Sequence, residues 1–586
     1  MNFIKPFWPY LKNYKARIAW GVLMVALAQV ASSAIPYMLK LAVDAIEVGL
    51  ESESKDAVLS TVAFYALIIV ALALVQMAFG MGMRWQIQAT SRYVENDIRE
   101  QYFRHLLTMS MKYYSQMPTG DLMSRATHDV NSIRMFLSFG IRMLFDAAIA
   151  LTLGLTVMCF IDWQLALYAL IPMPFLTLAM NRVAGRINTG FREVQELFAD
   201  ISSRVQENLS GIRVVKAYVQ REGEIETFEK LNRQYLNKNK RLIGIESIIR
   251  PLAFLLSGTS LIIVLWLGGE RVLSGQISLG DFVAFNGYLT KLIFPIILVG
   301  WMIDRYQRAI AAMRRINAIL EEKTDIEDAD DVITPEEIRG DVELRNLTFG
   351  YDKKTVILDN LNLKIPAGSS VAIVGRVGSG KTTLGRLIPR LIQAGAGQLL
   401  IDGIPVEKLP LQVLRENIGF VPQDSFLFSD SLRENIALGV VDPTEEDITW
   451  AMETSQLLND LGDFPQGLDT MVGERGVTFS GGQKQRTALA RAVIRRPKIL
   501  ILDDAMASVD THTEEEILRR LKVMMAGRTT IIIAHRISTV MGADQIVVLD
   551  GGKVVELGTH DALLANNGTY AEMYQRQQLN QELSEI

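Results

Sequence analysis

Cysteine is nearly absent from this sequence, with a single residue, Cys159, among 586 positions. One thiol cannot form an intramolecular disulfide or a cysteine-based metal cluster, so both are excluded. Because Cys159 lies inside an apolar run, we expect a buried side chain without a chemical role. A basic excess is also lacking, since the formal net charge is −5. Nucleic acid is therefore not an expected partner.

A signal peptide is not recognisable at the start of the chain. Residues Met1 to Lys15 include aromatic and basic side chains, but no apolar core followed by a small-residue cleavage site. This composition predicts an amphipathic helix on the cytoplasmic surface of a membrane.

Apolar sequence is abundant, and it is concentrated in the first half of the chain. The length of 586 residues exceeds what one hydrophobic core supports, so at least two domains are expected. Stretches such as Ala63–Ala73 and Leu255–Leu267 are apolar all round, which disfavours a soluble amphipathic bundle. Six segments are long enough to cross a bilayer, namely Ile18–Leu41, Val58–Met83, Phe136–Ile161, Leu165–Met180, Ile245–Leu267 and Phe282–Ile303.

Lysine and arginine indicate how these spans are oriented, because cytoplasmic connections keep an excess of both. Residues 84–134 and 182–241 are rich in them, whereas the opposite connections are short or acidic. Both termini are therefore predicted in the cytoplasm. The two inner connections are rich in helix formers, which predicts helices that extend into the cytoplasm and turn back near Gly120 and Gly211.

Charged residues in membrane spans are costly and often functional. Five lie in or near the predicted spans, namely Asp44, Asp146, Glu246, Arg250 and Lys291. The alternative is a side chain that extends to the membrane surface, which we favour for Asp44. Both interpretations stay open for Asp146.

An acidic and polar segment follows Leu320 and predicts a linker over residues 321–339. It would join a membrane domain, residues 1–320, to a second domain, residues 340–586. That domain contains a phosphate-binding loop after an apolar strand, Ser370–Val374. Glycines let backbone N–H groups wrap a phosphate, the lysine supplies charge, and the threonine hydroxyl binds magnesium. The residues expected to hold ATP here are Gly375, Gly378, Ser379, Gly380, Lys381, Thr382 and Thr383.

Two further apolar strands lead into polar residues. Lys498–Leu502 is followed by Asp503, a carboxylate suited to magnesium, and Thr529–Ala534 is followed by His535. Because ligands gather at the carboxyl edge of parallel sheets, we expect both side chains near the phosphate-binding loop.

The segment Ser480, Gly481, Gly482, Gln483 resembles the signature of the ATP-binding cassette family, and the chain is identified as a member on this motif. The resemblance implies that the signature completes the ATP site of an opposite subunit. Ser480 is suited to this, because it can cap the following helix and aim free N–H groups at a γ-phosphate. Phe479 stands where leucine is usual, and we expect a mild packing change.

Other landmarks of the family occur in order along the chain. By resemblance, Tyr351 stacks on adenine, Gln423 contacts magnesium, and His535 contacts the γ-phosphate. Gly473 to Gly476 matches a segment found beside the signature in exporters. Ser508, Val509 and Asp510 match the loop that crosses between paired cassettes, which makes Asp510 a nucleotide-site residue. Core packing remains an alternative for Tyr351.

One departure changes the expected mechanism. The family usually has glutamate after the magnesium-binding aspartate, where it polarises the attacking water, but this chain has Asp504. A displacement of about 1 Å can cost roughly 100-fold in rate, so this site should bind ATP and hydrolyse it poorly. The pattern resembles heterodimeric exporters with one weak and one competent ATP site. A relaxed backbone that lets Asp504 act unaided is the alternative.

Together these features predict a membrane α-helical domain with six transmembrane helices, of the type IV exporter kind, fused to an α/β P-loop ATP-binding cassette domain. The expected protein is a multi-pass ATPase of the inner, cytoplasmic membrane that exports hydrophobic drugs or lipids with a second half-transporter. The alternatives are a homodimeric exporter or flippase, and a nucleotide-sensing membrane subunit that does not pump. The expected catalytic residues are Asp504, His535 and Gln423, and the expected magnesium ligands are Thr382, Gln423 and Asp503.

Overall fold

The computed structural model describes residues 5–50, 55–352, 354–473, 479–509, 511–524 and 526–585. The chain forms two compact units. One consists of Met1–Leu107 with Thr119–Glu322, and the other of Thr108–Pro118 with Lys323–Ile586.

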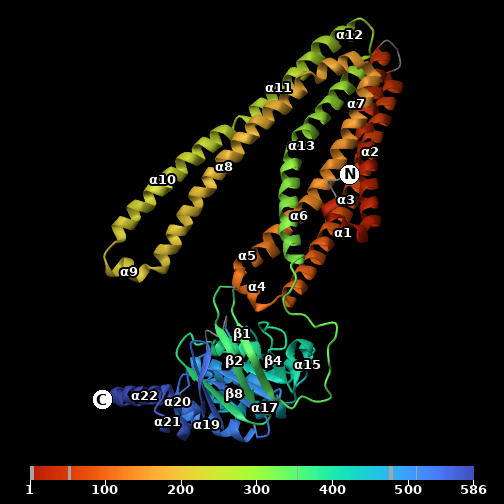
Figure 1. Cartoon of the computed structure of the whole chain (residues 1–586). Coiled ribbons are helices and arrows are strands. Elements are labelled where there is room, and N and C mark those ends of the chain that lie inside the picture. The colour runs from red at the N-terminus through yellow and green to blue at the C-terminus, as the bar shows by residue number, and fades with distance from the viewer. Residues whose placement is uncertain are drawn as a thin grey trace. The chain divides into compact units, whose positions relative to one another are not determined.

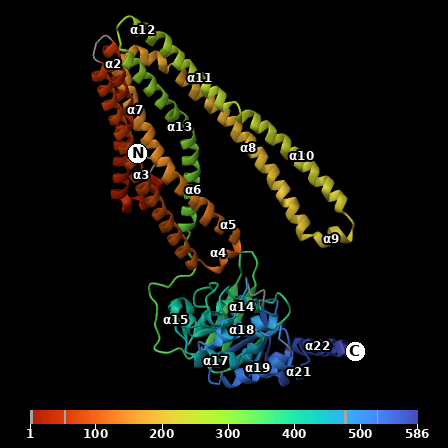
Figure 2. The ribbon, with the colours of Figure 1, turned by 180° about the vertical axis from the view of Figure 1, so that it is seen from behind.

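The first unit is built from long helices, which are α2 (Lys15–Leu50), α3 (Lys55–Thr108), α7 (Ile141–Leu170), α8 (Pro172–Ser210), α10 (Arg221–Glu246), α11 (Ile249–Ile263) and α13 (Leu279–Leu320). Shorter helices connect them, namely α1 (Trp8–Leu11), α5 (Thr119–Ser124), α6 (Val130–Met135), α9 (Ile212–Ala217) and α12 (Gly269–Leu273). Helices α8 and α10 run side by side and are joined by α9 (Figure 1; Figure 2). The predicted turns near Gly120 and Gly211 are confirmed, because α5 begins at Thr119 and α8 ends at Ser210.

Four helical stretches among the described residues are long and apolar enough to cross a membrane, namely Lys5–Val48, Asp56–Thr108, Thr119–Phe175 and Phe254–Leu273. They contain the first three predicted spans and overlap the fourth, Leu165–Met180, and the fifth. The sixth predicted span, Phe282–Ile303, lies in α13 and, like the fourth, includes residues whose side chains are outside the described set. Asp162 separates the third and fourth predicted spans, because its backbone is not helical and its Oδ1 accepts hydrogen bonds from two following amides.

Helices α7 and α13 pack closely around small and apolar side chains. A Cβ atom on Gly154 of α7 would lie 2.9 Å from Leu292 of α13, so this contact requires glycine. Met158 is fully buried in the same interface. Cys159 was expected to be buried, and that prediction is wrong, since its side chain is exposed. The next residue of a helix points about 100° away, so the interface that buries Met158 leaves Cys159 outside.

Three segments of the membrane unit have π-helical hydrogen bonding among the described residues, namely Arg125–Asp129, Phe136–Gly140 and Val264–Gly268. The first two interrupt the helical run that begins with α5 and continues into α7. The third separates α11 from α12. Such segments are rare and insert one extra residue into a turn.

The second unit contains a four-stranded antiparallel sheet in the order β2-β1-β4-β5 and a six-stranded sheet in the order β10-β9-β3-β8-β7-β6. The first sheet is formed by β1 (Val342–Phe349), β2 (Leu358–Ile365), β4 (Leu399–Ile401) and β5 (Ile404–Pro405). The second is formed by β3 (Ser370–Gly375), β6 (Ile418–Val421), β7 (Ile499–Asp503), β8 (Thr529–Ile533), β9 (Gln545–Asp550) and β10 (Lys553–Gly558). The three strands predicted from apolar runs are thus confirmed as β3, β7 and β8.

The six-stranded sheet is parallel from β9 to β6, and its central strands are buried on both faces. In β7, Leu500 and Leu502 join one hydrophobic cluster, while Ile499 and Ile501 join another. Burial on both faces explains why β3, β7 and β8 are nearly continuous apolar sequence. The helices of this unit are α4 (Met111–Gln116), α14 (Lys381–Leu387), α15 (Leu411–Glu416), α16 (Leu432–Ala437), α17 (Glu445–Thr454), α18 (Gly481–Val493), α19 (Thr511–Met524), α20 (Ile537–Val540), α21 (His560–Ala565) and α22 (Thr569–Glu585).

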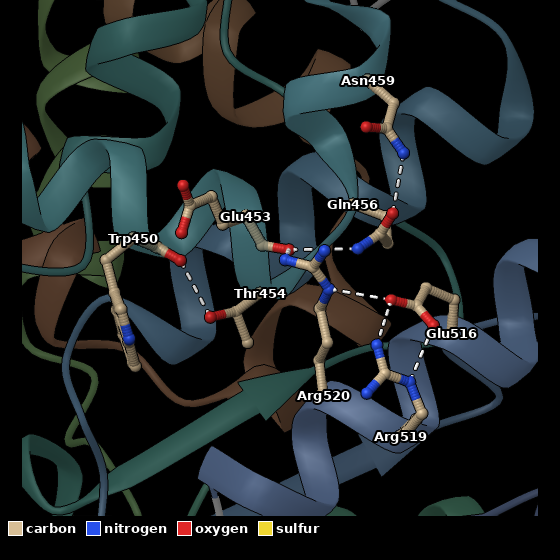
Figure 3. Close-up of polar contacts among 8 residues, drawn as sticks. All are labelled: Trp450, Glu453, Thr454, Gln456, Asn459, Glu516, Arg519 and Arg520. Atoms are coloured by element: carbon tan, nitrogen blue, oxygen red, sulfur yellow. Dashed lines mark hydrogen bonds and ion pairs between the residues drawn. The ribbon is translucent and has the colours of Figure 1, made fainter.

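Arginine side chains join α17 to α19 (Figure 3). Arg520 donates from Nη1 to the carbonyl oxygen of Glu453, at the end of α17, over 3.1 Å. Glu516 accepts two hydrogen bonds from Arg519, at 2.9 and 2.6 Å, and one from Arg520 at 3.1 Å. These bonds lower the pKa of Glu516 to about 2. A cation at the carboxyl end of a helix complements its dipole, so α17, which contacts α18, is also held by α19.

Candidate functional site

The phosphate-binding loop lies between β3 and α14, and glycine is required along it. Gly375, Gly378 and Gly380 have φ values of +153°, +84° and +97°. Residues other than glycine rarely adopt such backbone angles. A Cβ atom on Gly380 would also lie 2.5 Å from Leu358 Cδ2. The loop is therefore a tight turn that exposes backbone N–H groups at the start of a helix, an arrangement that favours anions.

Lys381 lies within this loop rather than in solvent. Its side chain is buried, and Nζ donates to the carbonyl oxygens of Gly375 and Arg376, at 2.9 Å each. Burial lowers the pKa of the Lys381 ammonium below its ordinary value. The charge is thus held at the mouth of the loop, where phosphate oxygens could replace the two carbonyl acceptors.

Asp503 ends β7 and faces Thr382 at the start of α14. Thr382 Oγ1 donates to Asp503 Oδ1 over 3.0 Å, and burial raises the pKa of the Asp503 carboxyl. Among the described residues, Asp503 Oδ2 and Ser379 Oγ are buried without a hydrogen-bond partner. Buried oxygens without donors are suited to a hard cation such as Mg²⁺. The residues present therefore fit a nucleotide with its magnesium ion.

The register of the sheet brings the other catalytic candidates to the same edge. Ile533, the last residue of β8, pairs with Asp503 of β7 and with Ile373 of β3. His535 follows two residues later, on the same side as the phosphate-binding loop. The amide of Asp504 donates to the carbonyl of Ile533 over 2.8 Å, which fixes its backbone at this edge.

Gln423 follows β6 and reaches the same place. Its Nε2 donates to Asp504 Oδ2 over 3.5 Å, and the Gln423 side chain is exposed. Asp504 has φ of +50°, a left-handed conformation that aspartate tolerates better than most residues. The structure thus brings together Gln423, Asp503 and Asp504 at the carboxyl ends of the two neighbouring strands β6 and β7.

Tyr351 lies just beyond β1, beside the start of α14. Its hydroxyl is 3.3 Å from Oγ1 of the buried Thr383, and its ring meets Phe349 edge to face at 5.2 Å. The side chain is 47% exposed, so part of the ring is accessible to a ligand. This position is compatible with stacking on a purine, since π-faces bind without hydrogen bonds.

The signature segment begins α18 as predicted. Ser480 Oγ accepts from the amide of Gln483 over 3.2 Å, while the amide of Ser480 donates to Gln483 Oε1 over 3.0 Å, which completes a capping box. Gly481 and Gly482 lie against the loop after β7, where added Cβ atoms would be 3.1 Å and 3.2 Å from atoms of Ser508. Phe479 is buried and stacks on Phe464 with a centroid distance of 4.9 Å.

The site therefore has two parts in this chain. Hydrogen bonds join Thr382 to Asp503, Gln423 to Asp504 and Tyr351 to Thr383. Within the described ranges, no hydrogen bond joins these residues to Ser480, Gly481, Gly482 or Gln483. Asp510 and Glu474 to Gly476, which the family resemblance singled out, lie outside the described residues.

Sequence reasoning missed Gln485, whose side chain links the two parts. Its Oε1 accepts from the amide of Ser508 over 2.8 Å, and its Nε2 donates to the carbonyl of Asp504 over 3.5 Å. The side chain is 6% exposed. The available signal was a polar residue among the mostly apolar buried residues of α18.

Replacing Gln485 with leucine should loosen the loop after β7. The change leaves the amide of Ser508 without its acceptor, and a buried unpaired donor costs about 1–3 kcal/mol. We expect peptides that cover residues 504–509 to exchange amide hydrogen roughly tenfold faster, as measured by mass spectrometry. Gln412→Leu is the control, because Gln412 is exposed and donates to Glu416, one helical turn away. Equal exchange in wild type and Gln485→Leu would contradict this role.

The chain is similar to known transporters along nearly its whole length. Residues 18–296 match the model of the ABC transporter transmembrane region, and residues 358–507 match the ABC transporter model. A probable multidrug resistance ABC transporter ATP-binding/permease protein of Bacillus subtilis, YheI, is 36% identical over 576 residues, which is 97% of each chain.

Two further similarities concern a curated protein and a solved structure. The ATP-dependent lipid A-core flippase of Syntrophus aciditrophicus is 33% identical, over 98% of this chain and 95% of that protein. The solved structure of a bacterial Atm1-family ABC exporter with ATP bound superposes with a TM-score of 0.81 at 28% identity, covering 96% of this chain and 99% of that one.

Proposed function

The chain belongs to the ATP-binding cassette transporters of the exporter type, and from this premise we propose that it is one half of a heterodimeric exporter whose own ATP site hydrolyses weakly. Membership makes the chain an ATPase coupled to transport across a membrane. The proposal concerns which ATP site uses this chain's phosphate-binding loop and which uses its signature segment.

Asp504 is the observation that carries the proposal. It follows Asp503 directly, and its backbone is held by Ile533 and Gln485. Because the backbone is fixed at both its amide and its carbonyl, little freedom remains to move the shorter carboxylate forward. A shortfall of about 1 Å toward the attacking water lowers the rate roughly 100-fold.

In this proposal the remaining side chains of the edge bind and orient the nucleotide. Thr382, Gln423 and Asp503 would hold the magnesium ion, Lys381 would donate to phosphate oxygens in place of its two carbonyl acceptors, and Tyr351 would offer its exposed ring to the base. His535 donates to the terminal phosphate. Bound Mg²⁺ supplies neutralisation of phosphate charge.

The signature serves the partner's site in this proposal. Ser480 orders the first turn of α18, so the N–H groups of Gly481 and Gly482 stay free at the positive end of a helix. Asp510 belongs to the loop that we propose crosses to the partner. The competent site would then combine this signature with a phosphate-binding loop and a catalytic glutamate from the partner.

We further propose that the substrates are hydrophobic drugs or lipids, since similar proteins are named as a multidrug resistance transporter and as a lipid A-core flippase. The excess of lysine and arginine in residues 84–134 and 182–241 supports cytoplasmic positions for both termini. With this orientation the cassette would face cytoplasmic ATP at the inner, cytoplasmic membrane.

Purification of the chain with and without its co-purifying partner tests the proposal. We expect substantial ATP hydrolysis only from the pair. Replacement of the partner's catalytic glutamate with glutamine should remove nearly all of it, whereas Asp504→Asn should change it little. Mass spectrometry of the purified complex identifies the partner.

Reconstituted vesicles distinguish the remaining alternatives. ATP-dependent movement of a hydrophobic dye supports an exporter, whereas nucleotide binding without transport would indicate a regulatory subunit. Full activity from the chain alone, lost in Asp504→Asn, would establish a homodimer with Asp504 as its base and overturn the heterodimer proposal.

A further inference from the structure

A cavity of about 280 Å³ with both polar and apolar walls lies between α2, α7 and α13 of the membrane unit. Its apolar walls include Met143, Ala147, Ala150 and Pro295. Charged side chains in such a place are costly, and they commonly mark the path of a substrate. The cavity contains three of them, Arg142, Asp146 and Lys291.

The Lys291 ammonium is hydrogen-bonded, but it has no counter-ion among the described residues. Its Nζ donates to Ser32 Oγ over 2.9 Å and to the carbonyl oxygen of Ser32. No carboxylate of the described residues lies within ion-pair distance of this ammonium. Neutral oxygens position the charge without compensating it.

Arg142 is only weakly compensated. Its Nε lies 4.0 Å from Asp146 Oδ2, at the limit of an ion pair, and this buried Nε has no hydrogen-bond acceptor among the described residues. Asp146 instead accepts a hydrogen bond from Gln29 Nε2 over 3.2 Å. Two cations and one carboxylate leave the cavity with an excess positive charge.

We propose that this cavity binds the anionic head group, a phosphate or a carboxylate, of an amphipathic substrate. The inference rests on the proposed function and narrows its substrate class. An anion between Lys291 and Arg142 would give both cations charge-assisted partners in a low-dielectric site. A cationic drug would be repelled, and a neutral one would leave Lys291 uncompensated.

The size of the cavity limits what enters it. Pockets for drug-sized ligands are commonly about 300–1,000 Å³, so this cavity takes a head group and leaves an apolar tail outside it. The anion could be carried by a membrane phospholipid or by a free amphiphile. Both sources present the same chemistry to Lys291 and Arg142.

The test uses the assembled transporter, with its partner, in a neutral maltoside detergent. Native mass spectrometry counts the binding of dodecyl phosphate and of dodecyltrimethylammonium, which differ in the charge of the head group. We expect dodecyl phosphate to bind more tightly, and Lys291→Gln to weaken it about tenfold or more. Arg84→Gln is the matched control, because Arg84 is an exposed cation of α3 outside the cavity.

Two further variants are expected to strengthen or to reverse binding, which a loss of folding could not do. Asp146→Asn should tighten binding of dodecyl phosphate, and Lys291→Glu should reverse the preference toward dodecyltrimethylammonium. Phosphatidylglycerol and phosphatidylcholine, titrated in the same way, separate the two sources. Selective binding of phosphatidylglycerol indicates a lipid head group, and binding of dodecyl phosphate alone indicates a free amphiphile.

Equal affinity for the two dodecyl probes, or equal affinity of wild type and Lys291→Gln for dodecyl phosphate, would overturn the inference. Binding of Mg-ATP is measured on the same samples. If ATP binds normally but the two probes bind equally well, the anionic substrate class is rejected and the proposed function still stands. Absent ATP binding in the wild-type complex removes the proposed function itself.

Discussion

Asp504→Glu is expected to raise ATP turnover at this chain's own phosphate-binding loop by roughly 100-fold, because the added methylene moves a carboxylate about 1 Å closer to the attacking water. The backbone needs no new position, since the amide of Asp504 is already bonded to the carbonyl of Ile533 at 2.8 Å. Glutamate accepts the φ of +50° less readily than aspartate, which costs on the order of 1 kcal/mol and reduces the gain somewhat.

ATP hydrolysis at the partner's site must be abolished before turnover at this chain's own site can be measured. The pair is therefore prepared with the partner's catalytic glutamate changed to glutamine, so that phosphate release reports only the site built on Gly375 to Thr382. Asp504→Asn in the same background is the control, because it keeps the size of aspartate and removes its charge. If Asp504→Glu released no more phosphate than Asp504→Asn, carboxylate length would not explain the weak site.

Gly481→Asp is expected to reduce ATP hydrolysis by the assembled pair about 100-fold or more, the effect of losing a main electrostatic contact to the reacting group. A carboxylate at the first turn of α18 places negative charge where the proposal expects a phosphate. The helix itself should persist, since acidic residues are favourable at a helix N-terminus. The added side chain must also displace Ser508, whose Cβ would lie 3.1 Å from the new Cβ.

The comparison with Lys381→Met makes this result specific. If this chain's signature serves the competent site and Lys381 the weak one, Gly481→Asp must be the more damaging change. Gly462→Asp controls for the added charge, because Gly462 is exposed and a Cβ there meets no atom within 4 Å. A larger loss from Lys381→Met would reverse the assignment of the weak site.

Local sequence patterns predicted the cassette well. Strand β7 is buried on both faces, so its apolar run and the aspartate that ends it were visible without tertiary information. The capping box of Ser480 and Gln483 is likewise local, since both partners lie within one helical turn. The roles of these residues toward ATP remain predictions.

Packing between distant segments was not predictable in the same way. The bond between Lys291 and Ser32 joins residues 259 positions apart, and the bond between Gln485 and Ser508 joins residues 23 positions apart. Cys159 was wrongly expected to be buried because an all-apolar span gives no sign of which side meets another helix. Hydropathy identifies the solvent of a helix, while burial depends on its neighbours.

The π-helical segment Phe136–Gly140 has a mechanical consequence for the cavity. It directly precedes the stretch of α7 that carries Arg142 and Asp146. Successive residues of an α-helix are about 100° apart around the axis. If the π-helical turn moved along α7 to a position beyond Asp146, the side chains of Arg142 and Asp146 would therefore rotate by about that angle. A shift of one residue in the hydrogen-bond register would then turn the charged side chains of Arg142 and Asp146 out of the cavity. Apolar neighbours would take their place, and a bound head group would lose its charged partner without any break in the helix.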